Sequence, residues 1–532
     1  MIRRLLRIGT RPSPELAPHR IDRRAVPRLP NWLGALLAGV AGVAHALSFA
    51  PLEIWWLQVL ATGALVALLA NARPATAALR GWIFGFGWLA AGLWWLYISL
   101  HRYGNLPAWL SVIAVVVLAA LLALYYAAAA ALWAHTRRKA VQTDALLFAA
   151  WWLLAELARG RFLTGFPWIA GGYAHTSGPL ADWAPYVGVY GLGAMSAWGA
   201  ALVALGLLGL RNGRWGFLRS LSPLLVPIAV LAVGVALPQQ FTSSTGTISV
   251  TLLQTNVAQD EKFDAPHIDA ALAWHRIRLA GAKGQLVVTP ESSLPVLPAQ
   301  IPAETWQAYE RPFQAAGRGA IVGTFLGGDR RGYTNSVVGL GASQRVSDGT
   351  FYHYGKHHLL PFGEFVPPGF HWMVAMMRIP IGDQAHGEET ASFAVAGQRV
   401  RPLICYEDLF GEDFVDAMVG PGAATMMANV TNLAWFGPLL VQDQHLQFSR
   451  MRALEFQRGQ VRATNTGATA VVDHLGHVTA RLPPFVEGAL EASIEGRTGD
   501  TPYARWLSRW HLWPLWLVAL GVVLASRLVR QR

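Results

Sequence analysis

The sequence contains only one cysteine, Cys405, among 532 residues, so the chain cannot form an internal disulfide. It also has little charge: 14% of its residues are Asp, Glu, Lys or Arg, against roughly 25% in an ordinary soluble domain. No metal-ligand cluster, phosphate-binding glycine loop or internal repeat stands out, so we expect no metal site and no cofactor. The single cysteine excludes a disulfide-rich secreted domain. The low charge, together with a hydrophobic share of 53%, favours a membrane protein.

Uncharged stretches long enough to cross a bilayer lie almost entirely before residue 240 or after residue 510. A transmembrane helix needs about 20 consecutive apolar residues. Windows of this kind predict a polytopic α-helical membrane domain of about eight transmembrane helices, at 31–50, 53–70, 81–100, 107–134, 144–158, 188–210, 222–238 and 511–526. The fifth, seventh and eighth windows are short, so the predicted number holds to within about one helix.

Arginine and lysine are spread unevenly over the connections between these windows. Residues 1–30 carry eight of them and the connections at 71–80, 135–143 and 211–220 carry two, three and three, whereas the alternate connections carry at most two. Because basic residues stay on the cytoplasmic side, both termini are expected in the cytoplasm and the segment before the last helix in the periplasm of a Gram-negative cell. The net charge of +12 is then mainly a topology signal, and no nucleic-acid partner is expected.

The segment at about 246–495 has a different pattern, in which short β-rich runs alternate with amphipathic stretches at 266–282 and 441–457. The candidate strands are Ile248–Gln254, Gln285–Thr289, Ala320–Phe325, Asn335–Gly339, Val400–Ile404, Ala424–Ala428 and Ala468–Val472. This alternation predicts a layered α/β domain. The expected organisation is a basic N-terminal segment (1–30), a transmembrane domain (31–240), this α/β domain (246–495), and a C-terminal transmembrane helix with a cytoplasmic tail (506–532).

The single cysteine lies where the apolar run Val400–Ile404 gives way to the charged pair Glu407 and Asp408. The end of a buried strand lifts the next side chain out of the sheet, which suits a nucleophile flanked by carboxylates. The alternative is a core cysteine, because free cysteine is among the most buried residue types.

A thiol nucleophile needs a base, and it needs donors for the oxyanion that forms when a carbonyl is attacked. Glu291 follows the apolar run Val287–Thr289 and a proline, and it is a candidate general base. Lys356 follows Gly355 before an apolar loop, and its ammonium is expected to stabilise an oxyanion and to lower the thiol pKa. Each motif is weak alone, since a strand-end glutamate or a lysine beside a glycine is commonly a solvated surface group.

In this order, the three motifs resemble those of the nitrilase superfamily of carbon-nitrogen hydrolases. The resemblance implies an α/β nitrilase-like α-β-β-α sandwich with a catalytic triad of Glu291, Lys356 and Cys405 at its strand ends. With the membrane helices added, nearly the whole chain from about residue 31 resembles bacterial apolipoprotein N-acyltransferases. The segment from Glu156 to Trp168 resembles that family's loop after the fifth helix. This resemblance implies a multi-pass protein of the inner membrane whose catalytic domain faces the periplasm.

The family pattern also implies essential carboxylates at Glu364 and Glu407, and support for the cysteine from Tyr406. The alternative for Glu407 is an outward-facing structural acid. For Glu156 and Arg159, spaced i,i+3, a helix-end ion pair is the favoured interpretation.

The resemblance implies an acyl transfer in two half-reactions at one site, and hence ping-pong kinetics. Cys405 takes a fatty acyl chain from a phospholipid donor, expected to be phosphatidylethanolamine, and the α-amine of an S-diacylglyceryl-cysteine apolipoprotein accepts it. The loop at 362–381 is rich in aromatic and Met residues, among them Phe365, Phe370 and Trp372, and is expected to form a lid toward lipid. Further expected substrate contacts are Trp168, Asn429, Asn432, Trp435 and Phe436. Core packing is the alternative for the aromatic residues.

Two other functions stay open on the sequence alone. In a membrane-tethered amidase or nitrilase, water would take the acyl group from the same cysteine. In a transporter or scaffold, the soluble domain would only bind. The predicted spans contain few ionisable residues, which argues against an ion or substrate path through them. His357 and His358 are expected to be loop residues, because the triad already supplies a base and an oxyanion donor.

Overall fold

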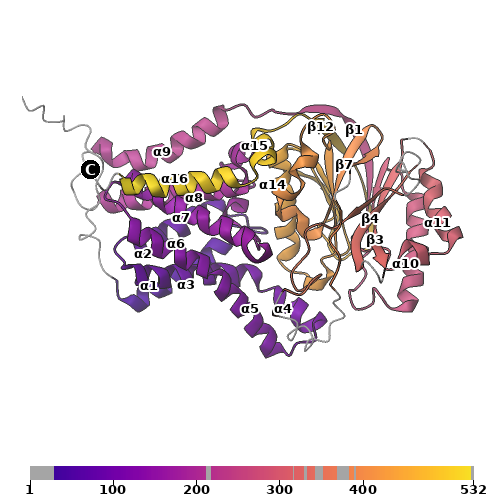
Figure 1. Ribbon diagram of the computed structural model, residues 1–532, viewed down its shortest axis with the longest axis horizontal. Coiled ribbons are helices and arrows are strands. Elements are labelled where there is room, and N and C mark those ends of the chain that lie inside the picture. Colours follow the sequence, from indigo (N-terminus) through magenta and orange to yellow (C-terminus); the bar gives the residue numbers. More distant parts are fainter. Residues whose placement is uncertain are drawn as a thin grey trace, which may run out of the picture.

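The computed structural model describes residues 29–210, 217–315, 317–328, 332–341, 351–367, 369, 383–388 and 391–528. Figure 1 shows a bundle of helices on one side and two β-sheets with covering helices on the other. The last helix, drawn in yellow, returns from the sheets to lie along the bundle. The two sheets are therefore formed by one continuous insertion between helices of the bundle.

The bundle contains nearly all the apolar helices. They are α1 (Asn31–Ala46), α2 (Trp55–Leu69), α3 (Pro74–Leu93), α4 (Leu96–Ile98), α5 (Ala108–Leu122), α6 (Leu124–Thr136), α7 (Val141–Arg161), α8 (Ala184–Leu210), α9 (Phe217–Ala236) and α16 (Trp513–Leu528). Between α7 and α8 the chain runs through three short 3₁₀ turns, at Phe162–Thr164, Gly171–His175 and Ala181–Trp183. The short helix α15 (Pro502–Trp510) leads from the sheets into α16.

Each of the eight predicted windows coincides with apolar helix, but length and composition alone support fewer crossings. Three helical segments within the described residues are long and apolar enough to span a membrane: Ala108–Thr136, Val141–Thr164 and Ala181–Gly209. Two bent pairs raise the number to five if each is one span, namely Pro74–Leu93 with Leu96–Tyr103 and Pro502–Trp510 with Trp513–Leu528. The other windows fall on shorter apolar helices, Asn31–Ala46, Trp55–Leu69 and Leu225–Ala236.

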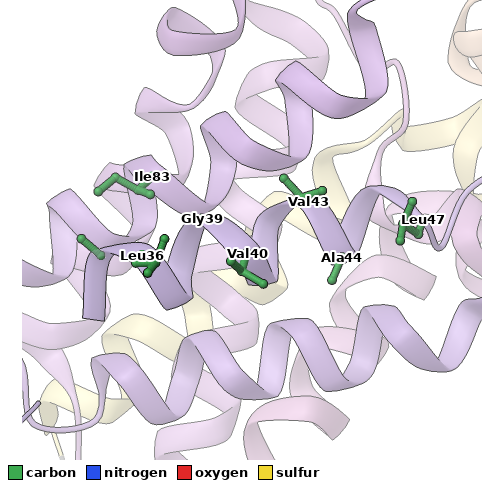
Figure 2. Close-up of a pocket in the computed structure, with 8 residues that line it drawn as sticks. Leu36, Gly39, Val40, Val43, Ala44, Leu47 and Ile83 are labelled. Carbon is green, nitrogen blue, oxygen red and sulfur yellow. The ribbon is translucent and has the colours of Figure 1, made fainter. Parts of the chain in front are cut away.

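The outer face of the bundle carries an open apolar groove of about 720 Å³ along α1 (Figure 2). Its lining residues are Ala35, Leu36, Gly39, Val40, Val43, Ala44, Leu47 and Ile83. None of them has a charged or polar side chain, and Leu36 and Val40 are more than half exposed. A surface of this kind is stable next to acyl chains rather than water. None of these side chains can act as a nucleophile, an acid or a base, so the groove is not a reactive site.

In the part of the chain that the structure describes, two six-stranded sheets form the other half of the molecule. The first has the order β12-β1-β2-β3-β4-β5 and the second β11-β10-β9-β8-β7-β6. The first contains β1 (Ser243–Gln254), β2 (Leu286–Val288), β3 (Gly319–Gly328), β4 (Gly332–Leu340), β5 (His353–Gly355) and β12 (Gly488–Thr498). The second contains β6 (Phe393–Val395), β7 (Gln398–Ile404), β8 (Met426–Thr431), β9 (Gln460–Thr464), β10 (Ala470–Val472) and β11 (Val478–Arg481). Three parallel strands lie at the centre of each, β1-β2-β3 and β7-β8-β9.

Each sheet buries side chains on both of its faces, one face against the other sheet and one against helices. Val250, Val288 and Ile404 belong to one apolar cluster between the two sheets. The opposite face of the first sheet packs through Val287 and Val322 against α10 (Ala265–Gly281) and α11 (Ala303–Glu310). The second sheet is covered by α14 (Val441–Phe456), with the short helix α13 (Gly411–Phe414) beside it. The predicted α/β fold with two sheets is confirmed, and the predicted helices at 266–282 and 441–457 coincide with α10 and α14.

Helix α14 lies between the second sheet and the bundle, as Figure 1 shows. Phe448 on α14 packs against Trp168 and Tyr173 from the loop after α7, with ring centroids 4.8 and 4.5 Å apart. Arg450 forms an ion pair with Glu53 at the start of α2. One hydrophobic cluster runs from the bundle into the second sheet and includes Tyr406, next to the cysteine. The turn that carries Cys405 is thus packed directly on the helix bundle.

Candidate active site

Three strand ends converge between the two sheets. Glu291 follows β2, Lys356 follows β5 and Cys405 follows β7, so the sequence places each candidate at the carboxyl end of a strand. Such ends are where open α/β sheets hold their ligands. The Cys405 thiol interacts electrostatically with Glu291, Lys356 and Glu364, and the structure therefore brings the three candidates into one site.

Glu291 lies in a tight turn above β3. The following residue, Ser292, has a positive φ of 48°, which is a strained backbone for a residue with a side chain. Gly323 on β3 passes so close to this turn that a Cβ there would lie 2.1 Å from the Pro290 carbonyl oxygen. The carboxylate accepts hydrogen bonds from the Asn335 amide at 2.6 Å and from the Asn432 backbone N–H at 2.8 Å. Backbone strain and two donors thus fix the candidate base.

Lys356 is 1% exposed and lies between two carboxylates. Its Nζ is 2.8 Å from Glu364 Oε1 and 3.5 Å from Glu291 Oε1. Burial by itself lowers the pKa of a lysine, but the charges of Glu364 and Glu291 outweigh it and raise the pKa of Lys356 above its usual value. Asn335 donates to both carboxylates, at 2.6 Å to Glu291 and 3.0 Å to Glu364. The ammonium is held charged in a fixed position, as an oxyanion donor requires.

Cys405 has a positive φ of 52° at the point where β7 turns into a 3₁₀ helix. A strained strand-to-helix turn of this kind projects a nucleophile out of the sheet. Burial and the charge of Glu291 raise the pKa of the thiol well above its usual value, although Lys356 acts in the other direction. Lys356 thus lowers the thiol pKa as expected, but burial and the charge of Glu291 outweigh its effect, so the net shift is upward. The thiol is neutral at rest and needs a base.

Glu407 ties the lysine loop to the cysteine turn. It is 4% exposed and accepts hydrogen bonds from Tyr354 Oη at 2.8 Å, from His357 N at 2.7 Å and from Ile404 N at 2.7 Å. Burial raises its pKa, and the backbone donors of Ile404 and His357 act in the other direction. The alternative of an outward-facing acid is wrong, since the side chain joins two loops from the inside.

Glu364 has a second anchor, because its Oε2 accepts from the Leu360 backbone N–H at 2.8 Å. Tyr406 is buried and donates its hydroxyl to the Gly165 carbonyl at 3.2 Å, so it links the cysteine turn to the loop after α7. The structure thus places the three supporting residues around the site in different ways: Glu364 holds the lysine, Glu407 joins two loops, and Tyr406 faces the bundle.

The loop after α7 is itself fixed by a buried ion pair, as expected for Glu156 and Arg159. Arg159 Nη2 is 3.5 Å from Glu156 Oε2, and Arg159 also donates to the carbonyls of Phe166 at 2.8 Å and Trp168 at 2.9 Å. Glu156 accepts from the Gly171 backbone N–H at 2.9 Å. The pair satisfies loop carbonyls and an amide that would otherwise be buried without partners.

The residues expected to contact substrate differ in their burial and in their neighbours. Asn429 donates to the Cys405 carbonyl at 3.2 Å, and the Asn432 backbone holds Glu291, so both support the site from within the protein. Trp168 is 5% exposed and stacks on His445, which favours a packing role. Trp435 and Phe436 are half-buried and meet Tyr103 and Trp95 of the bundle edge to face. Phe365 is half-buried, and Phe370 and Trp372 lie outside the described residues.

Several residues that hold the site gave no sequence signal. Asn335 is one, because a single asparagine within a strand has no distinguishing pattern. Others are Arg462 and His445. With Asp408, which the sequence showed only as an acid near Cys405, they form a buried cluster behind the cysteine, in which Arg462 Nη1 is 2.8 Å from Asp408 Oδ2. His357 and His358 are loop residues as expected, and His358 pairs with Asp413 at 2.7 Å.

Comparison with known proteins places this architecture in a family. Residues 41–202 match the apolipoprotein N-acyltransferase N-terminal domain, and residues 250–503 match the carbon-nitrogen hydrolase domain. A protein from Ralstonia nicotianae named apolipoprotein N-acyltransferase is 47% identical over 489 residues, which cover 90% of this chain and 91% of that protein. The chain belongs to the apolipoprotein N-acyltransferase family.

Other relatives support the same assignment. Apolipoprotein N-acyltransferases from Verminephrobacter eiseniae and Bordetella bronchiseptica are 46% and 39% identical, over 92% and 94% of this chain and 95% and 98% of theirs. The chain is accordingly an acyltransferase that combines an apolar helix bundle with a carbon-nitrogen hydrolase domain.

Proposed function

We propose that this acyltransferase moves a fatty acyl chain from a phospholipid, through a thioester on Cys405, to the N-terminal amine of an S-diacylglyceryl-cysteine apolipoprotein. The observation that carries the proposal is the buried site itself: a strained Cys405 beside a lysine that two carboxylates hold charged, packed on an apolar helix bundle. The names of the relatives support the class of acceptor.

In the first half-reaction, Glu291 removes the proton from the neutral Cys405 thiol, and the thiolate attacks the carbonyl carbon of a phospholipid acyl ester. Lys356 and the backbone N–H of Tyr406 stabilise the oxyanion of the tetrahedral intermediate. The ester C–O bond then breaks, and Glu291 returns its proton to the oxygen of the leaving lysophospholipid. A thioester remains on Cys405.

In the second half-reaction, the α-amine of the apolipoprotein attacks the thioester carbonyl and Glu291 accepts a proton from the nitrogen. The same oxyanion donors serve again. The C–S bond breaks, the amide forms, and the proton on Glu291 returns to the Cys405 sulfur, so the site is regenerated. Because both substrates use one cysteine in turn, the kinetics are ping-pong.

Incubation with donor phospholipid but no acceptor distinguishes a transferase from a hydrolase and from a protein that only binds lipid. The full-length protein is incubated in detergent micelles with phosphatidylethanolamine labelled in its acyl chains. Stable protein-bound label that is released on addition of a diacylglyceryl peptide supports the transferase. Free labelled fatty acid without acceptor indicates a hydrolase, and unreacted lipid indicates a protein that only binds; either result contradicts the proposal.

We propose further that the protein lies in the bacterial inner membrane with about eight spans, both termini in the cytoplasm and residues 246–495 in the periplasm. The arginine asymmetry and the presence of apolar helix in each of the eight predicted windows support this arrangement. A reporter active only in the periplasm is expected to be active when fused after residue 240 and silent when fused at Arg532. The opposite pattern would contradict the orientation and place the sheets away from the proposed substrates.

The loop at 362–381 is proposed to act as a lid that meets lipid, on the strength of its aromatic and Met content. Replacing Phe365, Phe370 and Trp372 together by serine is expected to slow acylation from bilayer phospholipid while changing the melting temperature little, since side chains that meet lipid in a lid contribute little to the packed core. The measurement compares acylation from vesicles with the midpoint of thermal unfolding. A variant that unfolds instead would assign these side chains to the core.

A further inference from the structure

The backbone carbonyl of Cys405 has two side-chain donors behind it. Asn429 Nδ2 lies 3.2 Å from this oxygen and His445 Nε2 lies 3.1 Å from it. The residue is held at a positive φ, a conformation that costs energy and persists only when its surroundings enforce it. Donors on this carbonyl therefore help to hold the orientation from which the thiol projects.

The other nitrogen of His445 fixes the proton on the ring. Arg462 Nη2 lies 2.7 Å from His445 Nδ1, and a guanidinium has only donors, so Nδ1 must be the acceptor. The Cys405 carbonyl can only accept, so Nε2 must carry the hydrogen. Both partners thus select the same neutral tautomer. Burial and the charge of Arg462 lower the pKa of His445 well below its usual value, which agrees with a ring that stays neutral.

Arg462 is held in turn by Asp408. Its Nη1 lies 2.8 Å from Asp408 Oδ2, and Gln460 donates to Asp408 Oδ1 at 3.0 Å. Asp408 belongs to the same 3₁₀ helix as Cys405, so the contacts run from the cysteine turn through His445 and Arg462 back to the turn. On the side of the bundle, Trp168 stacks on the imidazole at an angle of 2° with centroids 5.8 Å apart.

We propose that His445 is a positioning residue, whose Nε2–H tautomer holds the Cys405 backbone in the orientation that the acyl transfer needs. It touches no substrate and acts through the cysteine carbonyl. The inference rests on the proposed function, because the step that it affects is acylation of Cys405.

Two amide substitutions of similar polarity test the role. In His445→Gln the amide nitrogen replaces Nε2 and still reaches the Cys405 carbonyl, whereas in His445→Asn the shorter amide does not. We expect His445→Asn to lower the maximal rate of Cys405 acylation on the order of 100-fold and His445→Gln to stay within about tenfold of wild type. The phospholipid concentration at half-maximal rate should not change in either variant.

The control is His275 on α10, a second buried histidine, which bonds to the Ala271 carbonyl at 2.7 Å on the far side of the first sheet. His275→Asn is expected to keep the wild-type acylation rate. A wild-type rate in His445→Asn, or a His445→Gln variant as slow as His445→Asn, would overturn the proposal.

A measurement on the unmodified protein keeps the test independent of folding of the variants. ¹⁵N NMR of histidine-labelled, full-length protein in detergent should show the His445 proton on Nε2, and a proton on Nδ1 would overturn the inference. If wild-type protein gains no acyl group at all, the proposed function fails, whereas the tautomer is still decided by NMR. The two failures are therefore distinguishable.

Discussion

Lys356→Met is expected to lower the rate of Cys405 acylation by roughly 100- to 1,000-fold, equivalent to about 2.7–4 kcal/mol of transition-state stabilisation, because it removes an oxyanion donor. It also removes the cation between Glu291 and Glu364, which share Asn335 as a donor. Without that cation, two buried carboxylates of like charge lie side by side, which destabilises the fold. The measurement is the gain of acyl mass with time after addition of phospholipid.

A double variant separates catalysis from stability. Lys356→Met alone breaks a buried ion pair and is expected to cost about 3–5 kcal/mol of unfolding free energy. Adding Glu364→Gln removes the uncompensated charge, so the double variant should regain much of the melting temperature without regaining acylation. Recovery of the acylation rate in the double variant would contradict the role of Lys356 as an oxyanion donor.

Glu291→Gln is expected to slow acylation by about 100- to 10,000-fold, the usual contribution of a general base. The Cys405 thiol is neutral at rest because burial raises its pKa, so it reacts slowly unless a base removes its proton. Glutamine has nearly the same shape, and its oxygen can still accept from the Asn432 backbone N–H, so the fold should persist. The rate is measured by intact mass, and the fold by the melting temperature.

The matched control is Glu304→Gln, which makes the same change at an exposed position on α11. It should acylate at the wild-type rate. Unchanged acylation in Glu291→Gln would show that another group removes the thiol proton.

Two members of the candidate triad were accessible from the sequence because each follows an apolar run that ends in a turn. Glu291 and Cys405 follow the predicted strands that became β2 and β7. Lys356 was harder to place, because β5 has only three residues and no alternating pattern. Its position was predicted from the resemblance and from the glycine before it, rather than from the strand.

The cluster behind Cys405 could not be predicted, and α14 shows why. The stretch at 441–457 is predicted from the sequence as an amphipathic helix, which ordinarily has one buried side and one side in water. In the structure both faces are buried, because the second sheet covers one and the helix bundle covers the other. His445 thus appears in the sequence as a surface residue. Its hydrogen bonds to Cys405 and Arg462 depend on contacts between segments far apart in the chain.

The number of membrane crossings could not be predicted from the sequence either, because it also depends on how distant segments pack. Hydropathy located every apolar helix, but it carries no information on bends. The 61° angle between Pro74–Leu93 and Leu96–Tyr103, and the 87° angle between Pro502–Trp510 and Trp513–Leu528, lie inside stretches that the sequence shows as continuous or adjoining. Packing between helices sets such angles.

The central claim is a thioester on Cys405, and intact mass spectrometry tests it most directly because the chain has no other thiol. Full-length protein incubated with phosphatidylethanolamine, without acceptor, should gain the mass of one acyl chain, and neutral hydroxylamine should remove it. Cys405→Ala should gain nothing, and Cys405→Ser should form at most a slow oxygen ester, since a hydroxyl is the poorer nucleophile. An acyl adduct on Cys405→Ala, or no hydroxylamine-sensitive adduct on the wild-type protein, would contradict the account.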